Sequence, residues 1–319
     1  MRDLYGRKIN YLRISITDRC NLYCKYCCPK KERTYFKESE LITYKELFQV
    51  VTSLSDEIDT VRITGGEPLM REGVSEFVKN LKSQCGIKTV SMTTNGVLLE
   101  EHLDDLQHAG LDCINVSLDT LNPKKYEAIT GNNVLDKVLR GIDAAYQKGI
   151  HTKINCVLIK DVNENDILDL LLYVKDKEID LRFIELMPIG NAENLTGISS
   201  EEIRKIIAEN YQLERASPNY QGKGPAIYYR IPGFLGTIGF ISPMTNKFCD
   251  KCGRIRITAN GNLKPCLIHN FEVNIRDLLC KEVNIGNLKD TIFNIINNPT
   301  LLCDNEKIHH YAGMYQIGG

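Results

Sequence analysis

Short apolar segments alternate with amphipathic stretches through the first half of the chain, and this alternation constrains the fold more than any other feature. The apolar segments, which we expect to be strands, are residues 12–17, 60–64, 88–93, 113–118, 152–159 and 181–187. Between the first two, apolar residues recur on one helical face, at Tyr44, Leu47, Phe48, Val51 and Leu54. Asn122-Pro123 has the residues that begin a helix well, with asparagine as the cap. Strict alternation of strand and helix predicts a parallel sheet with right-handed crossovers.

Six strand–helix units are fewer than the eight of a closed barrel, so we expect an α/β fold that forms a partial, open TIM-type (β/α)6 barrel. Functional groups of such a barrel lie at the C-terminal ends of its strands. After about residue 190 the pattern changes to a polar loop (191–200), a helix (201–209) and short strands at 227–231, 235–241, 254–259 and 263–267. Asn260-Gly261 predicts a hairpin between the last two. We therefore expect a barrel domain, 1–190, and a smaller C-terminal α+β module, 191–319, that covers the open side.

Composition excludes several classes of protein. The chain has 40 Lys+Arg and 41 Asp+Glu, so it lacks the basic excess of a nucleic-acid-binding surface. It has no apolar run of about 18 residues or more, and its first residues have no apolar core of a signal peptide. We therefore expect neither a membrane span nor export, and a cytoplasmic location. In that compartment the 12 cysteines are not expected to form disulfides, so they require another explanation.

The first cysteine cluster follows the first predicted strand directly. Cys20, Cys24 and Cys27 have the spacing C-x3-C-x2-C. Three thiolates in a short loop, with no adjacent fourth cysteine or histidine, suit a [4Fe–4S] cluster with one open iron. A zinc loop with a distant fourth ligand, or a set of inert thiols, is the alternative. The neighbouring Cys28 could also supply the third sulfur, but we favour Cys28 as a small, half-buried hydrophobic residue.

A second cluster consists of Cys249 and Cys252, followed by Cys266 after the predicted hairpin. Three cysteines again leave one iron of a [4Fe–4S] cluster without a protein ligand. His269 could instead complete a Cys3His zinc site. The remaining cysteines are scattered singly and are interpreted as core or surface thiols: Cys85, Cys113, Cys156, Cys280 and Cys303.

Basic residues occur inside strands that are otherwise apolar. Four predicted barrel strands carry one each, at Arg13, Arg62, Lys153 and Arg182. The hairpin strand adds Arg254 and Arg256, which the two-residue period of a strand places on one face. A single such residue usually faces solvent. If all of them face the barrel interior, they need a compensating anion, and a triphosphate matches arginine geometry well. The pattern favours a polyanion site, with outward-facing cations as the alternative.

Five further stretches carry known motifs. Thr64-Gly65-Gly66-Glu67-Pro68 follows the second strand, and the others are the segments 93–96, 115–119, 182–187 and 249–266. With the first cysteine loop, the Gly-Gly-Glu-Pro stretch resembles the radical S-adenosylmethionine (SAM) enzymes, in which it holds the methionine end of SAM. The other four, with the terminal Gly318-Gly319, resemble the GTP 3′,8-cyclase family, which acts first in molybdenum cofactor biosynthesis. The resemblance spans nearly the whole chain, although the family usually has Met at the position of Cys28.

The resemblance implies a radical reaction on GTP. Reductive cleavage of SAM gives a 5′-deoxyadenosyl radical, which takes a hydrogen from C3′ of GTP before C3′ bonds to C8 of guanine. The first three cysteines would hold the SAM cluster, and the second three would hold a cluster whose open iron meets guanine. The residues implied to line the SAM site are Tyr26, Gly66, Ser117 and Met187. Those implied to contact GTP are Arg13, Arg62, Thr93, Lys153, Arg182, Arg254, Ile255 and Arg256.

The implied cofactors are SAM and two [4Fe–4S] clusters, and no side chain is expected to act as a nucleophile. The implied partners are an electron donor protein and cyclic pyranopterin monophosphate synthase, which takes up the product. A homodimer is a possible oligomeric state. The resemblance also suggests that Gly318 and Gly319 enter the active site near the cations. Two alternatives are a peptide-modifying radical SAM enzyme, which would need no polycationic interior, and a zinc-binding adaptor.

Overall fold

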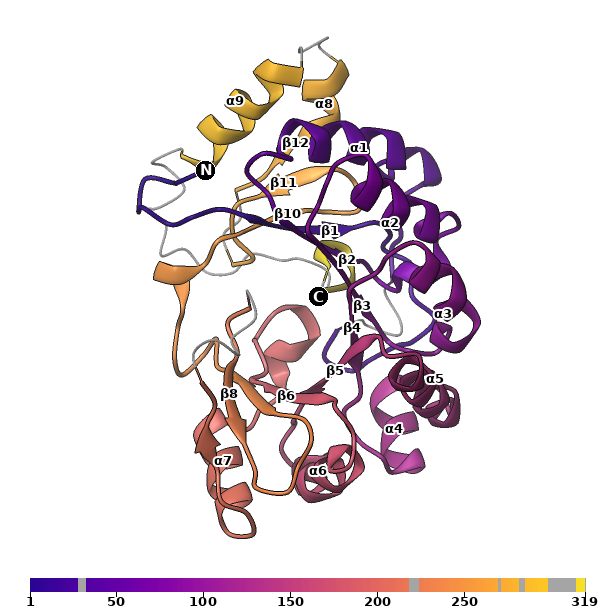
Figure 1. The fold of residues 1–319 in the computed structure, drawn as a ribbon, viewed down its shortest axis with the longest axis vertical. Helices are drawn as coiled ribbons and strands as arrows, with labels where there is room; N and C mark the ends of the chain where they lie inside the picture. The colour runs from indigo at the N-terminus through magenta and orange to yellow at the C-terminus, as the bar shows by residue number, and fades with distance from the viewer. Residues whose placement is uncertain (28–32, 218–223, 269–270, 281–284, 298–313, 319) are drawn as a thin grey trace.

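The computed structural model describes residues 1–27, 33–217, 224–268, 271–280, 285–297 and 314–318. Among these residues, twelve strands form one central sheet, in the order β12-β11-β10-β1-β2-β3-β4-β5-β6-β9-β8-β7. The neighbouring strands from β10 to β9 run parallel, and the strands at both edges run antiparallel. The sheet bends into an arc that does not close (Figure 1). The predicted partial barrel is therefore confirmed.

The parallel strands are β1 (Tyr11–Ser15), β2 (Thr60–Thr64), β3 (Thr89–Thr94), β4 (Cys113–Ser117), β5 (His151–Val157), β6 (Asp180–Ile184), β9 (Ile238–Ile241) and β10 (Arg254–Ile257). The edge strands are β7 (Glu214–Arg215), β8 (Ile227–Arg230), β11 (Asn262–Lys264) and β12 (Val273–Asn274). All six barrel strands predicted from the alternation form in the predicted order. Four of them are one or two residues shorter than predicted, and two have the predicted length. The hairpin predicted at Asn260-Gly261 joins β10 to β11.

Helices cover the outer, convex face of the arc (Figure 1). They are α1 (Tyr44–Ser53), α2 (Val74–Ser83), α3 (Leu99–His108), α4 (Pro123–Thr130), α5 (Leu135–Gln147) and α6 (Ile167–Val174). The later helices are α7 (Ser200–Ala208), α8 (Ile275–Cys280), α9 (Ile285–Ile296) and α10 (Met314–Ile317). Asn122 caps α4 as predicted, because its side chain accepts hydrogen bonds from the backbone N–H of Lys124 and Lys125. None of the helices in the described ranges could cross a membrane.

Within the described residues, the strands after about residue 190 do not form a sheet of their own. They join both edges of the barrel sheet, β10 beside β1 and β9 beside β6. An unpaired strand edge exposes a row of backbone hydrogen-bonding groups, and these additions satisfy the two edges of the six-stranded arc. The two halves of the sequence therefore share one sheet.

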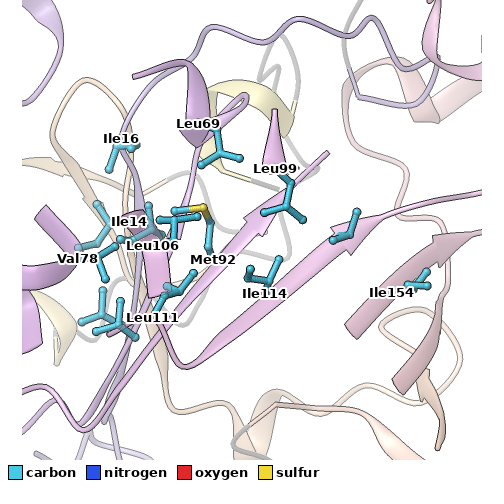
Figure 2. Close-up of a cluster of buried hydrophobic side chains, with 14 of the residues drawn as sticks. Ile14, Ile16, Leu69, Val78, Met92, Leu99, Leu106, Leu111, Ile114 and Ile154 are labelled. Carbon is cyan, nitrogen blue, oxygen red and sulfur yellow. The ribbon is translucent and has the colours of Figure 1, made fainter. Parts of the chain in front are cut away.

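Alternation along each strand separates an apolar face from a polar one. On β1, Leu12 and Ile14 are fully buried against the helices, with Arg13 between them on the other face. Figure 2 shows Ile14 in this apolar layer with Met92 and Ile114, from strands β3 and β4. Because the helices occupy the convex side, the polar residues of the strands line the concave interior.

Candidate active site

Three arginines lie side by side on neighbouring strands. The register pairs Arg256 of β10 with Arg13 of β1, and Arg13 with Arg62 of β2. Arg254, two residues before Arg256, shares their face. Burial, with the charges of Arg256 and Arg62, holds the pKa of Arg13 well below its usual range, and burial with Arg254 lowers the pKa of Arg256 to about 10. The interior is therefore strongly positive along this wall.

A second group of cations lies across the interior on β5 and β6. The Lys153 ammonium donates to Asp180 at 2.8 Å and to the Tyr228 hydroxyl at 3.3 Å. Burial alone would lower the pKa of Lys153, but the Asp180 carboxylate outweighs it and raises the pKa. Arg182, which burial shifts to a lower pKa, donates to the side chain of Asn115. The cations predicted from the sequence thus meet in one interior, facing inward.

Several buried polar atoms of this interior have no hydrogen-bond partner within the described ranges. They are Nε of Arg182, Oγ1 of Thr93 and Oδ1 of Asn155, on strands β6, β3 and β5. Leaving such an atom unsatisfied costs about 1–3 kcal/mol. An anionic ligand in the interior would accept from Arg182 and Thr93, and a hydroxyl or amino group on the same ligand would donate to Asn155. Ile255 differs from its neighbours, because its side chain is fully buried on the opposite face and leaves only its backbone near the interior.

The first cysteine loop follows β1, as predicted, and lies against the end of α4. The N–H groups of Tyr23 and Lys25 donate to the carbonyls of Thr130 and Ile129 at 2.7 and 2.9 Å. The sulfur of Cys20 accepts from the N–H of Leu22 at 3.5 Å and from the Asn95 amide at 3.6 Å. Hydrogen bonds to cysteine sulfur are a means by which proteins tune iron–sulfur clusters. Cys28 lies outside the described residues.

The Gly-Gly-Glu-Pro stretch runs against the backbone that leads into this loop. A Cβ added to Gly66 would lie 2.3 Å from the carbonyl oxygen of Arg19, so only glycine fits there. Glu67 is fully buried and accepts from the Thr94 hydroxyl at 2.7 Å and the Asn95 N–H at 2.7 Å. Burial raises the pKa of Glu67 to about 7. Glu67 thereby fixes Asn95, whose amide reaches the Cys20 sulfur.

The four residues implied for SAM lie at or near the C-terminal ends of strands. Gly66 follows β2, Ser117 ends β4, and Met187 follows β6. In the cysteine loop, the Tyr26 hydroxyl donates to Asp119 at 2.7 Å. Asp119 also accepts from the N–H of Val157 at 2.8 Å, and burial raises its pKa to about 6. The structure thus brings these residues to the same edge of the sheet as the cysteine loop.

The second cysteine set lies where β10 joins the sheet. Cys249 begins a short 3-10 turn, Cys249–Lys251, Cys252 follows this turn, and Cys266 follows β11. Burial raises the pKa of Cys249, and the nearby Cys266 and Cys252 add to the rise. Arg254 donates from Nε to the sulfur of Cys252 at 3.4 Å. His269, the alternative zinc ligand, lies outside the described residues.

The thiolates of the first cysteine set are donors that suit an iron–sulfur cluster. Within the described ranges, no three His, Cys, Asp or Glu side chains converge on a point where one metal ion could bind. A cubane cluster places each thiolate on a different iron atom, so its ligands surround a volume instead of a point. The N–H and guanidinium donors directed at Cys20 and Cys252 also suit sulfur atoms that carry negative charge.

The C-terminal residues lie inside the arc of the sheet (Figure 1). The Gly318 carbonyl accepts from Nη1 of Arg256 at 3.1 Å. Gly318 has φ +76°, and a Cβ there would lie 2.8 Å from the Thr64 side chain. The expected position of the tail beside the cations is confirmed for Gly318, while Gly319 lies outside the described residues.

Several residues of the site were missed in the sequence. Lys264 is fully buried opposite Arg256. Asp180 and Tyr228 hold Lys153, and Asp119 holds Tyr26. Two signals could have found them. Asp180 is a charged residue directly before the predicted strand 181–187, Lys264 is one inside the predicted strand 263–267, and Asp119 ends one of the recognised motifs.

Comparisons with known proteins agree with this geometry. The family model described as "Radical SAM superfamily" matches residues 14–174, and "Molybdenum Cofactor Synthesis C" matches residues 179–300. A GTP 3′,8-cyclase of Clostridium perfringens (strain 13 / Type A) is 40% identical over 323 residues, covering 100% of both chains. A GTP 3′,8-cyclase of Alkaliphilus oremlandii (strain OhILAs) is 41% identical over 330 residues, also covering 100% of both.

Solved structures share the fold at low sequence identity. Streptococcus suis SuiB has a TM-score of 0.66 at 14% identity, over 93% of this chain and 68% of that one. The SuiB structure bound to S-adenosylmethionine has a TM-score of 0.62 at 16% identity, over 90% of this chain and 68% of that one. These likenesses establish the architecture.

Proposed function

The chain belongs to the radical SAM superfamily and, within it, to the GTP 3′,8-cyclase family, and from this premise we propose that it acts on GTP. The proposed reaction converts GTP into (8S)-3′,8-cyclo-7,8-dihydroguanosine 5′-triphosphate, the first step of molybdenum cofactor biosynthesis. One observation carries the proposal beyond the family. Cations on neighbouring strands face a common interior, with Arg256, Arg13 and Arg62 in direct register. A triphosphate supplies the charge that such an interior needs.

The proposed cofactors are SAM and two [4Fe–4S] clusters. Membership of the superfamily supports SAM and one cluster. The second cluster is proposed from the separate set of Cys249, Cys252 and Cys266, which adjoins the cationic wall through Arg254. Cys20, Cys24 and Cys27 would hold the first cluster. When bound, the first cluster and SAM together supply an electron and a carbon-centred radical able to remove a hydrogen atom from C3′ of GTP.

The chain's own residues bind and orient the reactants. Arg13, Arg62 and Arg256 would bind the triphosphate from one wall, and Lys153 and Arg182 from the other. Hydrogen bonds from GTP would satisfy the unpartnered Oγ1 of Thr93 and Oδ1 of Asn155.

Around SAM, the Glu67 carboxylate holds the backbone of Asn95, and Asp119 holds the hydroxyl of Tyr26. The tail, seated on Arg256, would exclude water from the triphosphate end. Catalysis by this chain is therefore positioning of the C3′ hydrogen, and no side chain is needed as a nucleophile.

We extend the proposal to the surroundings of the enzyme. It would act in the cytoplasm, receive electrons from a donor protein and pass its product to cyclic pyranopterin monophosphate synthase. A homodimer is compatible with this role. We also propose that residues 1–190 act as the SAM-binding part and residues 191–319 as the part that carries the second cluster and completes the GTP site.

Anaerobic incubation of the purified protein with SAM, a reductant and GTP tests the function. We expect 5′-deoxyadenosine and a cyclised nucleotide that keeps its triphosphate. Iron and sulfide analysis of the same preparation separates the alternatives. Zinc without iron would support an adaptor, and 5′-deoxyadenosine that forms equally with and without GTP would contradict GTP as the substrate.

A further inference from the structure

Arg33 binds the first cysteine loop through the loop's own backbone. Its Nη1 donates to the carbonyl oxygen of Cys20 at 2.8 Å, and its Nη2 donates to that of Leu22 at 2.5 Å. Nη1 also donates to the hydroxyl of Tyr35 at 2.5 Å. A guanidinium presents its donors in one rigid plane, so a single side chain can hold two carbonyls of a tight loop in fixed positions. Arg33 therefore fixes the part of the loop that begins at Cys20.

The same guanidinium lies among aromatic rings that include a residue of the C-terminal tail. Its carbon lies 4.5 Å from the centre of the Tyr23 ring, 5.4 Å from that of Tyr35 and 5.6 Å from that of Tyr315. The rings of Tyr35 and Tyr315 meet edge to face, with centres 6.5 Å apart. We call Arg33, Tyr23, Tyr35 and Tyr315 the tyrosine box. Such cation–π contacts strengthen when the ring is removed from water, and Tyr315 is only 1% exposed.

The tail is held beside the box by hydrogen bonds as well. The Tyr315 hydroxyl and the Gln316 amide both donate to the carbonyl of Thr34, each at 3.4 Å. Three residues after Tyr315, the carbonyl of Gly318 accepts from Arg256. The tail thus connects the tyrosine box to the cationic wall of the interior.

We propose that Arg33 is a positioning residue that couples the first cysteine loop to the C-terminal tail. The loop and the tail share one guanidinium, so a change that releases either of them weakens the hold on the other. Coupling between two sites is reciprocal: if fixing the loop favours the bound position of the tail by some free energy, fixing the tail favours the bound position of the loop by the same free energy. The tail then seats fully on Arg256 when Arg33 holds the carbonyls of Cys20 and Leu22. This inference goes beyond the proposed reaction, since it concerns the conformation of the chain before any substrate binds.

Hydrogen exchange followed by mass spectrometry tests the coupling in the full-length protein without GTP. Arg33→Gln removes the shared charge. We expect backbone amides in residues 20–24 and in residues 314–318 to exchange at least about tenfold faster than in the unaltered protein, because charge-assisted hydrogen bonds are lost. Tyr315→Ala alters only the tail side of the box. We expect it to accelerate exchange of residues 20–24 as well, because Arg33 loses a ring that helps to hold its guanidinium in place.

Matched variants make the result decisive. Tyr315→Phe keeps the ring, so exchange of residues 20–24 should stay near that of the unaltered protein. Arg140→Gln removes an exposed arginine paired with Glu100 and should change neither segment. The Arg33→Gln/Tyr315→Ala double variant should exchange residues 20–24 no faster than Arg33→Gln alone. The coupling would be overturned if Tyr315→Ala accelerated exchange only in residues 314–318, or if Arg33→Gln accelerated it only in residues 20–24. It would also be overturned if the two changes accelerated exchange of residues 20–24 independently, so that their effects added in the double variant. If Arg33→Gln fails to fold, Tyr315→Ala and its Phe control decide the question alone.

Discussion

At the scale of single residues, the cations of the interior have unequal surroundings. Arg13 lies between two other arginines in register, whereas Lys153 already pairs with a buried carboxylate, Asp180. A triphosphate that approaches Lys153 must share it with Asp180. The affinity for GTP therefore depends on this acid as well as on the cations.

Lys153→Ala should weaken GTP binding by about ten- to a hundredfold, the value of a charge-assisted contact. It also leaves the negative charge of Asp180 uncompensated beside the phosphates. We therefore expect the Lys153→Ala/Asp180→Asn double variant to bind GTP more tightly than Lys153→Ala alone. Equilibrium dialysis with GTP measures this order, and Arg140→Ala is the matched surface control. The polyanion interpretation fails if guanosine binds as tightly as GTP.

A second question at this scale is whether Cys27 or Cys28 supplies the third thiolate of the first cluster. We propose Cys27 as this ligand, because the spacing C-x3-C-x2-C of Cys20, Cys24 and Cys27 is the one by which the chain resembles the superfamily. Cys28→Met should retain SAM cleavage, and Cys27→Ser should abolish it, as measured by release of 5′-deoxyadenosine. The opposite pair of results would move the ligand to Cys28.

At the scale of elements, the sequence predicted each barrel strand because alternation is a local signal. The inward direction of the cations could have been read from the same signal. Arg13 lies between Leu12 and Ile14, which must face the helices, so its own side chain must face the interior. The pairing of β9 with β6 and of β10 with β1 could not be predicted from the sequence, because pairing between strands far apart in the chain leaves no local pattern. The pairing of Asp180 with Lys153 could not be predicted for the same reason, since the two residues lie on different strands.

The Gly-Gly-Glu-Pro element gives a prediction of its own. Gly66→Ala places a Cβ 2.3 Å from a backbone oxygen, so the chain near Arg19 must shift. We expect the variant to be destabilised by about 1–3 kcal/mol, a typical cost of overpacking, and to bind SAM more weakly. Denaturant unfolding and SAM binding measure the two effects. Gly224→Ala, where an added Cβ meets nothing within 4 Å, should change neither.

At the scale of the whole molecule, one sheet joins the two cysteine sets. We predict that replacing Cys20, Cys24 and Cys27 together with serine leaves only the second cluster, because the two sets lie in separate loops. Iron analysis and electron paramagnetic resonance should show about half of the iron. Loss of all the iron, or of none, would count against two independent sites.

The C-terminal tail connects the tyrosine box beside the first cysteine loop to Arg256 in the cationic wall. Its deletion should therefore separate the binding of SAM and the clusters from catalysis. Removal of Gly318 and Gly319 takes away the carbonyl that Arg256 holds and opens the interior. We expect both clusters and SAM binding to persist, while cyclisation of GTP falls strongly because small misplacements of the reacting atoms are costly. Full cyclase activity in the truncated protein would show that the tail is a passive terminus. Loss of the clusters would show that it serves folding.

The central claim is that this interior places C3′ of GTP against the radical derived from SAM. Anaerobic turnover with GTP deuterated at C3′ tests it most directly, by mass spectrometry of the 5′-deoxyadenosine formed. We expect 5′-deoxyadenosine with one deuterium and a cyclised triphosphate that has lost it. Deuterium retained in the nucleotide, with unlabelled 5′-deoxyadenosine, would contradict the account.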